Sequence, residues 1–157
     1  MIKIFLVEDE VFALHALERK IEDLKGQYEI VGTAFNGEEA LARLEEVPAD
    51  IVMTDIRMPD MDGITLIETL KERDQKILPV IVSGYQEFDY AQRAVRLGVK
   101  DYLLKPVKVA ELEKCLSHCV EQLMEQAKKE NAVSFMIGED SFRMNVLSES
   151  TSFVVVY

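Results

Sequence analysis

The segment that decides the fold is IVMTDIRMPDMDG, residues 51–63. Its first four residues, Ile51–Thr54, form a short and mostly apolar run, which is typical of a strand buried on both faces. Asp55 follows at once, and Met58–Gly63 is rich in the Pro, Asp and Gly residues that interrupt regular structure. The apolar residues that come next recur at helical spacing: Leu66, Ile67 and Leu70. The segment therefore predicts a buried strand, an acid at its carboxyl end, a turn and a helix.

The same alternation of strand and helix continues on both sides of this segment. Strands are predicted at residues 2–7, 28–35, 51–54, 77–82 and 101–104. Helices are predicted at residues 11–25, from Asn36-Gly37, after Gly63, at residues 87–97, and from about Val109 to Asn131. Because alternating strands and helices pair in parallel through right-handed crossovers, the expected fold is α/β, a doubly wound parallel five-stranded sheet. Any functional site should then lie at the carboxyl ends of the strands.

Length and charge narrow the classes of function. A chain of 157 residues holds one compact domain plus an appendage, and its 48% apolar and 30% charged residues are typical of a globular protein. The net charge of −11 argues against direct binding of nucleic acid or anionic lipid by this chain. No apolar stretch approaches the ~20 residues that a membrane span needs, and no signal peptide is recognisable. The two cysteines make no disulfide framework, so a cytoplasmic location is expected.

Polar residues that suit phosphoryl chemistry follow four of the predicted strands. Glu8 and Asp9 follow the first strand, Asp55 the third, Ser83 the fourth and Lys105 the fifth. Any one acid here has an ordinary explanation as a turn former or helix cap, but turn chemistry does not explain all four positions. Three converging carboxylates repel one another unless a hard cation such as Mg²⁺ binds between them. Together with a hydroxyl and an ammonium, they predict a site that handles a phosphoryl group.

At these residues the chain resembles the receiver domain of bacterial two-component response regulators, over roughly residues 1–122. The resemblance implies the flavodoxin-like (βα)5 fold and phosphorylation of Asp55 by a sensor histidine kinase. It also implies the roles of the remaining site residues: a Mg²⁺ site from Glu8, Asp9, Asp55 and the Arg57 carbonyl, a phosphoryl-binding Lys105, a switch hydroxyl at Ser83 and a switch aromatic at Tyr102. Lys105-Pro106 matches the family's Lys-Pro pair, and its peptide bond is expected to be cis. Glu8 in place of the commoner Asp and Ser83 in place of Thr are mild departures.

The resemblance also narrows the biological role. Residues 83–91 and 98–106 look like the receivers that precede AraC-type helix-turn-helix output domains, which implies a transcriptional role through an output domain that this chain lacks. In such a receiver, the face formed by helix four, strand five and helix five switches on phosphorylation. The chain is then a regulatory module rather than an enzyme, with only self-directed phosphoryl transfer and autodephosphorylation.

Three other functions remain open. A stand-alone or degenerate receiver would act as a dimerisation scaffold, although it would not need Asp55, Ser83 and Lys105. An Asp-nucleophile phosphatase of the haloacid dehalogenase type needs a second Asp at the position of Arg57. A flavodoxin-like cofactor binder would place its phosphate against the acidic residues 8–10.

The C-terminal part is predicted in three pieces: a receiver at residues 1–122, a helical extension at 123–131, and a tail or the start of a further domain at 132–157. Alternation of Phe142, Met144 and Val146 with polar residues favours a β-hairpin over 141–157, and the ending at Tyr157 suggests a fragment. The spacing of Leu112, Leu116, Cys119 and Leu123 is a heptad seam, which favours a weak homodimer through helix five over a monomer. Cys115 and Cys119 are expected in the core rather than on a metal.

Overall fold

The structure is a computed structural model of the chain. It describes residues 1–73, 75–84, 88–99 and 101–147, and for residue 88 and residues 133–147 it describes the backbone alone. The strands are β1 (Ile2–Val7), β2 (Tyr28–Ala34), β3 (Ile51–Thr54), β4 (Leu78–Ser83) and β5 (Asp101–Leu104). The helices are α1 (Val11–Asp23), α2 (Gly37–Glu46), α3 (Gly63–Glu72), α4 (Phe88–Arg96) and α5 (Val109–Leu147).

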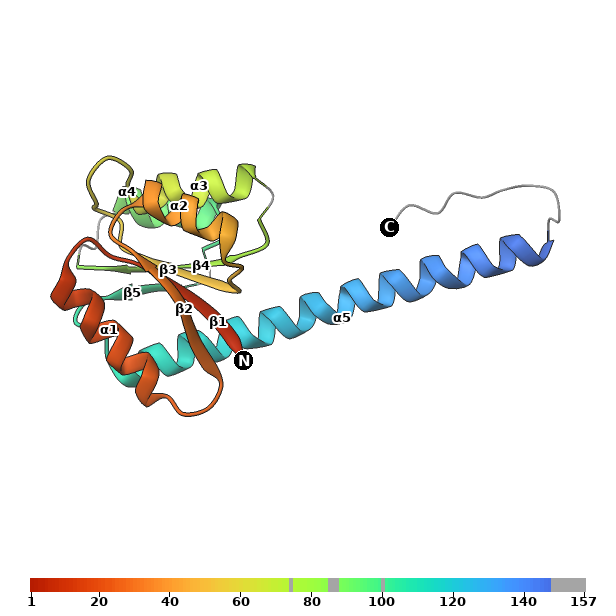
Figure 1. Cartoon of the computed structure of the whole chain (residues 1–157), viewed down its shortest axis with the longest axis horizontal. Helices are drawn as coiled ribbons and strands as arrows, with labels where there is room; N and C mark the ends of the chain where they lie inside the picture. Colours follow the sequence, from red (N-terminus) through yellow and green to blue (C-terminus); the bar gives the residue numbers. More distant parts are fainter. Residues whose placement is uncertain (74, 85–87, 100, 148–157) are drawn as a thin grey trace. The chain divides into compact units, whose positions relative to one another are not determined.

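The five strands form one parallel sheet in the order β2-β1-β3-β4-β5. Helices α2, α3 and α4 cover one face of this sheet, and α1 and the first turns of α5 cover the other (Figure 1). The predicted doubly wound fold is confirmed. Because the strand order reverses between β1 and β3, the crevice at their carboxyl ends is where such a sheet binds its ligand.

The core lies on both faces of the central strands. Phe5, Val7 and Val52 pack with Leu41 and Leu66 in a buried cluster on the side of α2 and α3. Because side chains alternate along a strand, Ile4, Leu6 and Met53 lie on the opposite face of the sheet. The buried side chains of α1 and α5 lie on that face as well: Leu14, Leu17, Ile21, Leu112 and Leu116. The predicted central strands are buried for this reason, and they hold the site residues that follow them in fixed positions.

The two cysteines are also part of this core. Cys115 and Cys119 are buried and form no disulfide. A hydrogen bond with Cys119, together with burial, raises the pKa of the Cys115 thiol, so that the thiol stays protonated. The expected core role of both residues is confirmed.

Side-chain caps fix the starts of α2 and α3 near the site. The Asn36 side chain accepts a hydrogen bond from the Glu39 backbone N–H (2.8 Å), and the Glu39 carboxylate accepts one from Phe35 N–H (3.0 Å). The pair is close to a capping box, except that Glu39 binds the N–H of the residue before the N-cap Asn36. At α3, the Asp62 carboxylate accepts from Thr65 N–H (2.7 Å). Both helices therefore begin at defined residues on the carboxyl edge of the sheet.

Helix α5 differs from the prediction. It does not end near Asn131 but continues to Leu147, so residues 141–147 are helical and the predicted first strand of a hairpin is wrong. No proline interrupts residues 132–147, and the single Gly138 costs a helix only about 1 kcal/mol. The predicted return strand, Phe153–Tyr157, lies outside the described residues.

The chain divides into two compact units, Met1–Cys119 and Val120–Tyr157. The first unit contains the sheet and all of the predicted site residues. Among the helices of the described residues, none is long and apolar enough to cross a membrane.

Candidate functional site

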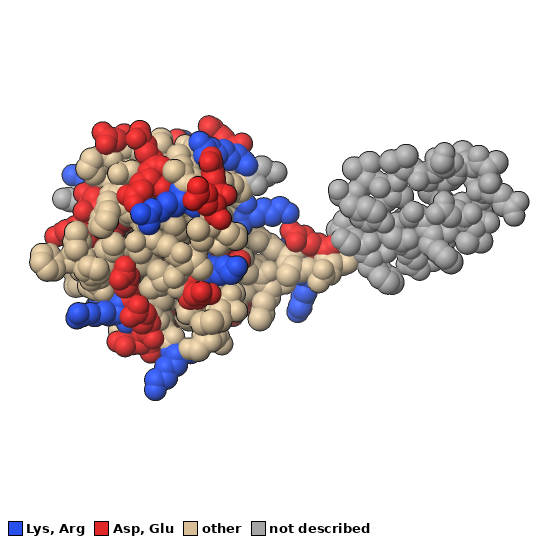
Figure 2. Space-filling view, in the orientation of Figure 1, with Lys and Arg blue, Asp and Glu red and all other residues tan. Residues whose placement is uncertain are grey.

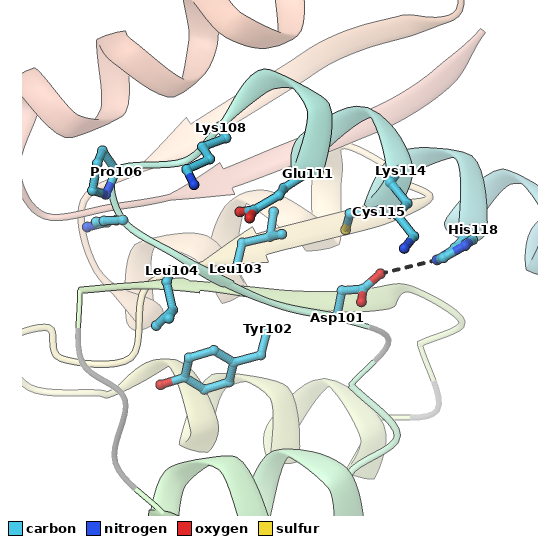
Figure 3. A pocket seen from close by; sticks show the side chains of 11 residues that line it. Asp101, Tyr102, Leu103, Leu104, Pro106, Lys108, Glu111, Lys114, Cys115 and His118 are labelled. Carbon is cyan, nitrogen blue, oxygen red and sulfur yellow. Dashed lines mark ion pairs between the residues drawn. The ribbon is translucent and has the colours of Figure 1, made fainter.

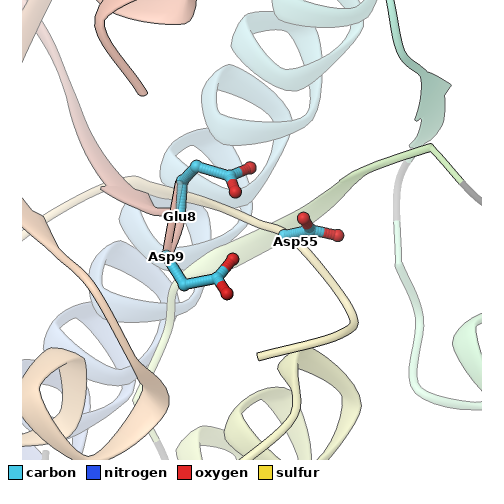
Figure 4. A group of neighbouring side chains, drawn as sticks. All are labelled: Glu8, Asp9 and Asp55. Carbon is cyan, nitrogen blue, oxygen red and sulfur yellow. The ribbon is translucent and has the colours of Figure 1, made fainter. Parts of the chain in front are cut away.

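Three carboxylates meet at the carboxyl edge of the sheet. Glu8 and Asp9 follow β1, and Asp55 follows β3, which pairs with β1 through Val7 and Thr54. Their ligand oxygens lie within 4.8 Å of one another, and in Figure 4 the three carboxylates are directed toward a common space. Glu8 is only 5% exposed and Asp55 8%, whereas Asp9 is exposed. The convergence that the sequence predicted is therefore present.

Lys105 joins two of these acids. Its Nζ donates to Glu8 Oε2 at 2.5 Å and to Asp55 Oδ2 at 2.9 Å. Lys105 follows β5, where its backbone N–H donates to the Ser83 carbonyl (2.9 Å). The Lys105-Pro106 peptide bond is cis, as predicted. The Lys105 ammonium thus bridges Glu8, which follows β1, and Asp55, which follows β3.

The remaining oxygens of the two buried acids accept hydrogen bonds from the backbone. Glu8 Oε1 accepts from Glu10 N–H at 3.1 Å, and Asp55 Oδ1 accepts from Ile56 N–H at 2.6 Å. Each of the four carboxylate oxygens therefore has a donor. Such bonds fix the orientation of both carboxylates before any ligand binds.

The electrostatic balance of the site favours an additional cation. The pKa of Glu8 is raised to about 7, chiefly by burial and also by the charge of Asp55, while the hydrogen bond from Lys105 acts in the opposite direction. Burial alone would lower the pKa of Lys105, but its hydrogen bonds to Glu8 and Asp55 raise that pKa above its ordinary value. A single lysine thus leaves the carboxylates with uncompensated negative charge.

The donor set fits Mg²⁺. Carboxylate oxygens are the ligands that this hard cation prefers, and Asp9 adds an exposed carboxylate beside two oriented ones. Within the described residues, these acids are the one group of three or more metal-ligating side chains that lie close enough together. Arg57, whose carbonyl is the fourth predicted ligand, lies two residues after Asp55. Its guanidinium is 5.9 Å from the centre of the Tyr90 ring on α4.

The backbone around Asp55 is closely packed, which the sequence did not indicate. The buried Thr54 hydroxyl donates to the Asp55 carbonyl at 2.8 Å. Gly63 N–H donates to the Ile56 carbonyl at 2.8 Å. A Cβ atom on Gly63 would lie 1.9 Å from the Asp55 carbonyl oxygen, so only glycine fits there. The sequence predicts Gly63 only as a turn residue, and no sequence pattern distinguishes that role from this close contact.

Ser83 and Tyr102 are hydrogen-bonded to each other. Ser83 is fully buried at the end of β4, and its side chain forms a hydrogen bond with the Tyr102 phenol. The Tyr102 ring packs against a buried cluster that includes Ile56 and Ile81. Burial raises the pKa of Tyr102, and the bond to Ser83 partly offsets this effect. The two predicted switch residues are therefore brought together next to the residue that follows Asp55.

A cavity of about 550 Å³ lies between β5 and the start of α5 (Figure 3). Its polar lining includes Asp101 and Lys105 together with four residues of the loop and helix beyond: Lys108, Glu111, Lys114 and His118. His118 Nδ1 lies 3.8 Å from Asp101 Oδ2, an oxygen that has no hydrogen-bond partner within the described part of the chain. No sequence pattern indicates this cavity, because it depends on how α5 packs on β5.

Comparison with known proteins agrees with this geometry. Residues 4–117 match the family model described as the response regulator receiver domain. The chain belongs to the response regulator receiver family. This receiver is 35% identical over 126 residues to the uncharacterized transcriptional regulatory protein YesN of Bacillus subtilis (strain 168), a match that covers 80% of this chain and 34% of YesN. It is 33% identical over 143 residues to the transcriptional regulatory protein HptR of Staphylococcus aureus (strain NCTC 8325 / PS 47), covering 91% of this chain and 56% of HptR.

Solved structures show the same fold. The receiver domain of AraT, a response regulator from Geobacillus stearothermophilus, is 34% identical with a TM-score of 0.72, and the match covers 80% of this receiver and 97% of that chain. A CheY-like receiver domain protein from Methanospirillum hungatei JF-1 is 26% identical with a TM-score of 0.69, covering 82% and 98% of the two chains. The receiver spans between about a third and just over half of the length of the curated relatives it matches.

Proposed function

We propose that this receiver accepts a phosphoryl group on Asp55 from a sensor histidine kinase. The observation that carries the proposal is the ammonium of Lys105, which lies within hydrogen-bond distance of both Asp55 and Glu8 at the acidic edge of the sheet. A cation beside a buried, oriented carboxylate suits the transfer of a negatively charged group to that carboxylate.

Each residue has a role in this transfer. An Asp55 carboxylate oxygen attacks phosphorus, the new O–P bond forms, and the P–N bond to the donor imidazole breaks. Lys105 neutralises one phosphoryl oxygen and Ser83 donates a hydrogen bond to another. Glu8, Asp9, Asp55 and the Arg57 carbonyl would hold Mg²⁺, which supplies charge compensation when it is bound. Mg²⁺ is thus the proposed cofactor.

The proposed response to phosphorylation begins at Ser83. In the structure its hydroxyl is bonded to Tyr102. A phosphoryl group of roughly −1.5 to −2 charge competes for that hydroxyl and releases the phenol. The ring can then shift its packing against the cluster around Ile56 and Ile81, which alters the face formed by α4, β5 and α5.

The proposed output is transcriptional control through an AraC-type helix-turn-helix domain. The names of YesN and HptR as transcriptional regulatory proteins support this proposal. Direct DNA contact by this chain is disfavoured by its net charge of −11. On the face shown in Figure 2, basic side chains are scattered among acidic ones. The proposed receiver occupies residues 1–122, in a cytoplasmic protein.

Phosphorylation is tested by mass. Incubation with acetyl phosphate and Mg²⁺ should add one phosphoryl group, measured on the intact chain. Asp55→Asn should abolish the adduct, and removal of Mg²⁺ by a chelator should do the same. Asp23→Asn, which changes an exposed acid at the end of α1, should leave labelling unchanged. An adduct that persists in Asp55→Asn would refute the assignment.

A weak homodimer through α5 is the second part of the proposal. Leu112, Leu116 and Cys119 are buried in the receiver itself, so the proposed contact uses Leu123, the 61%-exposed Met124 and the exposed Ala127 further along the helix. Sedimentation equilibrium with and without beryllofluoride should show a dimer that strengthens with this phosphoryl mimic. A monomer at high micromolar concentration in both conditions would exclude it.

A further inference from the structure

Thr54 places a hydroxyl where the fold needs only an apolar side chain. It is the last residue of β3, pairs with Val7 on β1 and Ile81 on β4, and is 0% exposed. Burying a hydroxyl is unfavourable unless it forms a hydrogen bond. Here the Thr54 hydroxyl donates to the carbonyl of the next residue, Asp55, at 2.8 Å.

The peptide unit that accepts this bond also holds the Asp55 side chain. The Asp55 carbonyl and the Ile56 N–H belong to one planar peptide group, so they turn together. That same N–H donates to Asp55 Oδ1 at 2.6 Å. Any rotation of this peptide that breaks the Thr54 bond therefore also moves the donor that orients the carboxylate.

The opposite side of the peptide is closed by α3. Gly63 lies so near the Asp55 carbonyl oxygen that a Cβ atom on it would be 1.9 Å away. Gly63 N–H also donates to the Ile56 carbonyl at 2.8 Å. Contact with Gly63 limits movement toward α3, and the Thr54 hydroxyl limits rotation toward β3.

We propose that Thr54 is a positioning residue for phosphorylation. Its hydroxyl fixes the peptide between Asp55 and Ile56, this peptide fixes Oδ1, and Oδ2 is thereby held toward the Lys105 ammonium at 2.9 Å. The inference rests on the proposed function of Asp55 and adds a residue that touches neither phosphoryl group nor metal.

Two substitutions separate the hydroxyl from the packing. Thr54→Val keeps the branched shape and removes the hydroxyl, whereas Thr54→Ser keeps the hydroxyl and removes the methyl group. The rate of labelling by acetyl phosphate at saturating Mg²⁺ should fall about threefold to tenfold in Thr54→Val, the effect of losing one hydrogen bond. It should stay within about twofold of the wild type in Thr54→Ser, although the lost methyl group lowers stability.

Urea unfolding of all three proteins provides the structural comparison. If Thr54 acts only through stability, the less stable variant will lose more labelling. Where Thr54→Ser is the less stable of the two, its labelling rate will then be no higher than that of Thr54→Val. That order, or a Thr54→Val rate equal to that of the wild type, would overturn the inference while leaving the proposed function intact.

Amide exchange gives a readout that needs no phosphoryl donor. In the metal-free full chain, exchange of the Ile56 N–H, followed by two-dimensional NMR, should be faster in Thr54→Val than in the wild type and Thr54→Ser. If the wild type is not labelled at all, the proposed function fails, and the exchange rates still decide whether Thr54 positions Asp55. Equal Ile56 exchange in all three proteins would overturn the inference.

Discussion

The two halves of the site differ in how closely their atoms are packed. In the half built on β1 and β3, both oxygens of Glu8 and Asp55 have donors, and Gly63 leaves no room beside Asp55 for a methyl group. In the half built on β4 and β5, a methyl group on Gly84 would meet no atom of the described residues within 4 Å, and Tyr102 is only partly buried. The half that would bind the phosphoryl group is thus fixed in advance, whereas the half that would respond has space to rearrange.

Equivalent substitutions at the two glycines should test this contrast most strongly. Gly63→Ala should lower the free energy of unfolding by about 3 kcal/mol, because its Cβ overlaps a backbone oxygen that cannot move freely. Gly84→Ala should change it by less than about 0.5 kcal/mol, since the added methyl group meets no atom of the described residues. Urea unfolding of both variants measures the difference.

The labelling of the two glycine variants adds a second comparison. Gly63→Ala should also lose most of its labelling by acetyl phosphate, whereas Gly84→Ala should retain it. Similar stabilities for the two variants would mean that the two halves do not differ in packing.

The pH dependence of stability should reflect the crowding of charge in the β1–β3 half. The pKa of Glu8 is raised from its ordinary 4.5 to about 7, so the folded chain binds a proton that the unfolded chain has lost between these values. The free energy of unfolding of the metal-free protein should therefore decrease from pH 5 to pH 8, by about 2 kcal/mol from this group.

Glu8→Gln isolates this contribution. The variant removes the titrating group and should be less sensitive to pH than the wild type, as measured by urea unfolding at several pH values. Saturating Mg²⁺ should reduce the wild-type loss at pH 8, because a bound cation stabilises the ionised acids. Parallel pH profiles for the two proteins would contradict the raised pKa.

A smaller effect is expected in the β4–β5 half. Tyr102→Phe removes the hydrogen bond to Ser83 and should cost about 1 kcal/mol of unfolding free energy. A double-mutant cycle with Ser83→Ala, measured by urea unfolding, should show that most of this cost is shared between the two residues. Additive effects would mean that this bond does not hold Tyr102.

The sequence predicted the parts of the site that depend on strand order. Apolar strands followed directly by Glu8, Asp55 and Lys105 place those residues at one edge of any doubly wound sheet. The contacts of Thr54 and Gly63 could not be predicted in this way, because they depend on the distance between β3 and α3 after packing. A Thr in a strand and a Gly in a turn are each common without any special contact.

At the end of α5 the sequence pattern was visible but ambiguous, since it fits both a strand and a helix. Alternation of Phe142, Met144 and Val146 over a few residues favoured a strand, yet the backbone is helical to Leu147. Phe135, Phe142 and Val146 also lie seven and four residues apart, which is helical spacing, so the same residues satisfy both periods. The uninterrupted helix that precedes them decides between the two.

The two bonds of Lys105 also bear on chemoselectivity. An amine and a carboxylate lie 2.9 Å apart in this pocket, and both are nucleophiles toward an acyl phosphate. Because the pKa of Lys105 is raised above 10.5, fewer than about one amine in a thousand lacks its proton at pH 7. A protonated amine has no lone pair with which to attack, so acylation of Lys105 is suppressed and Asp55 remains the reactive nucleophile of the pair.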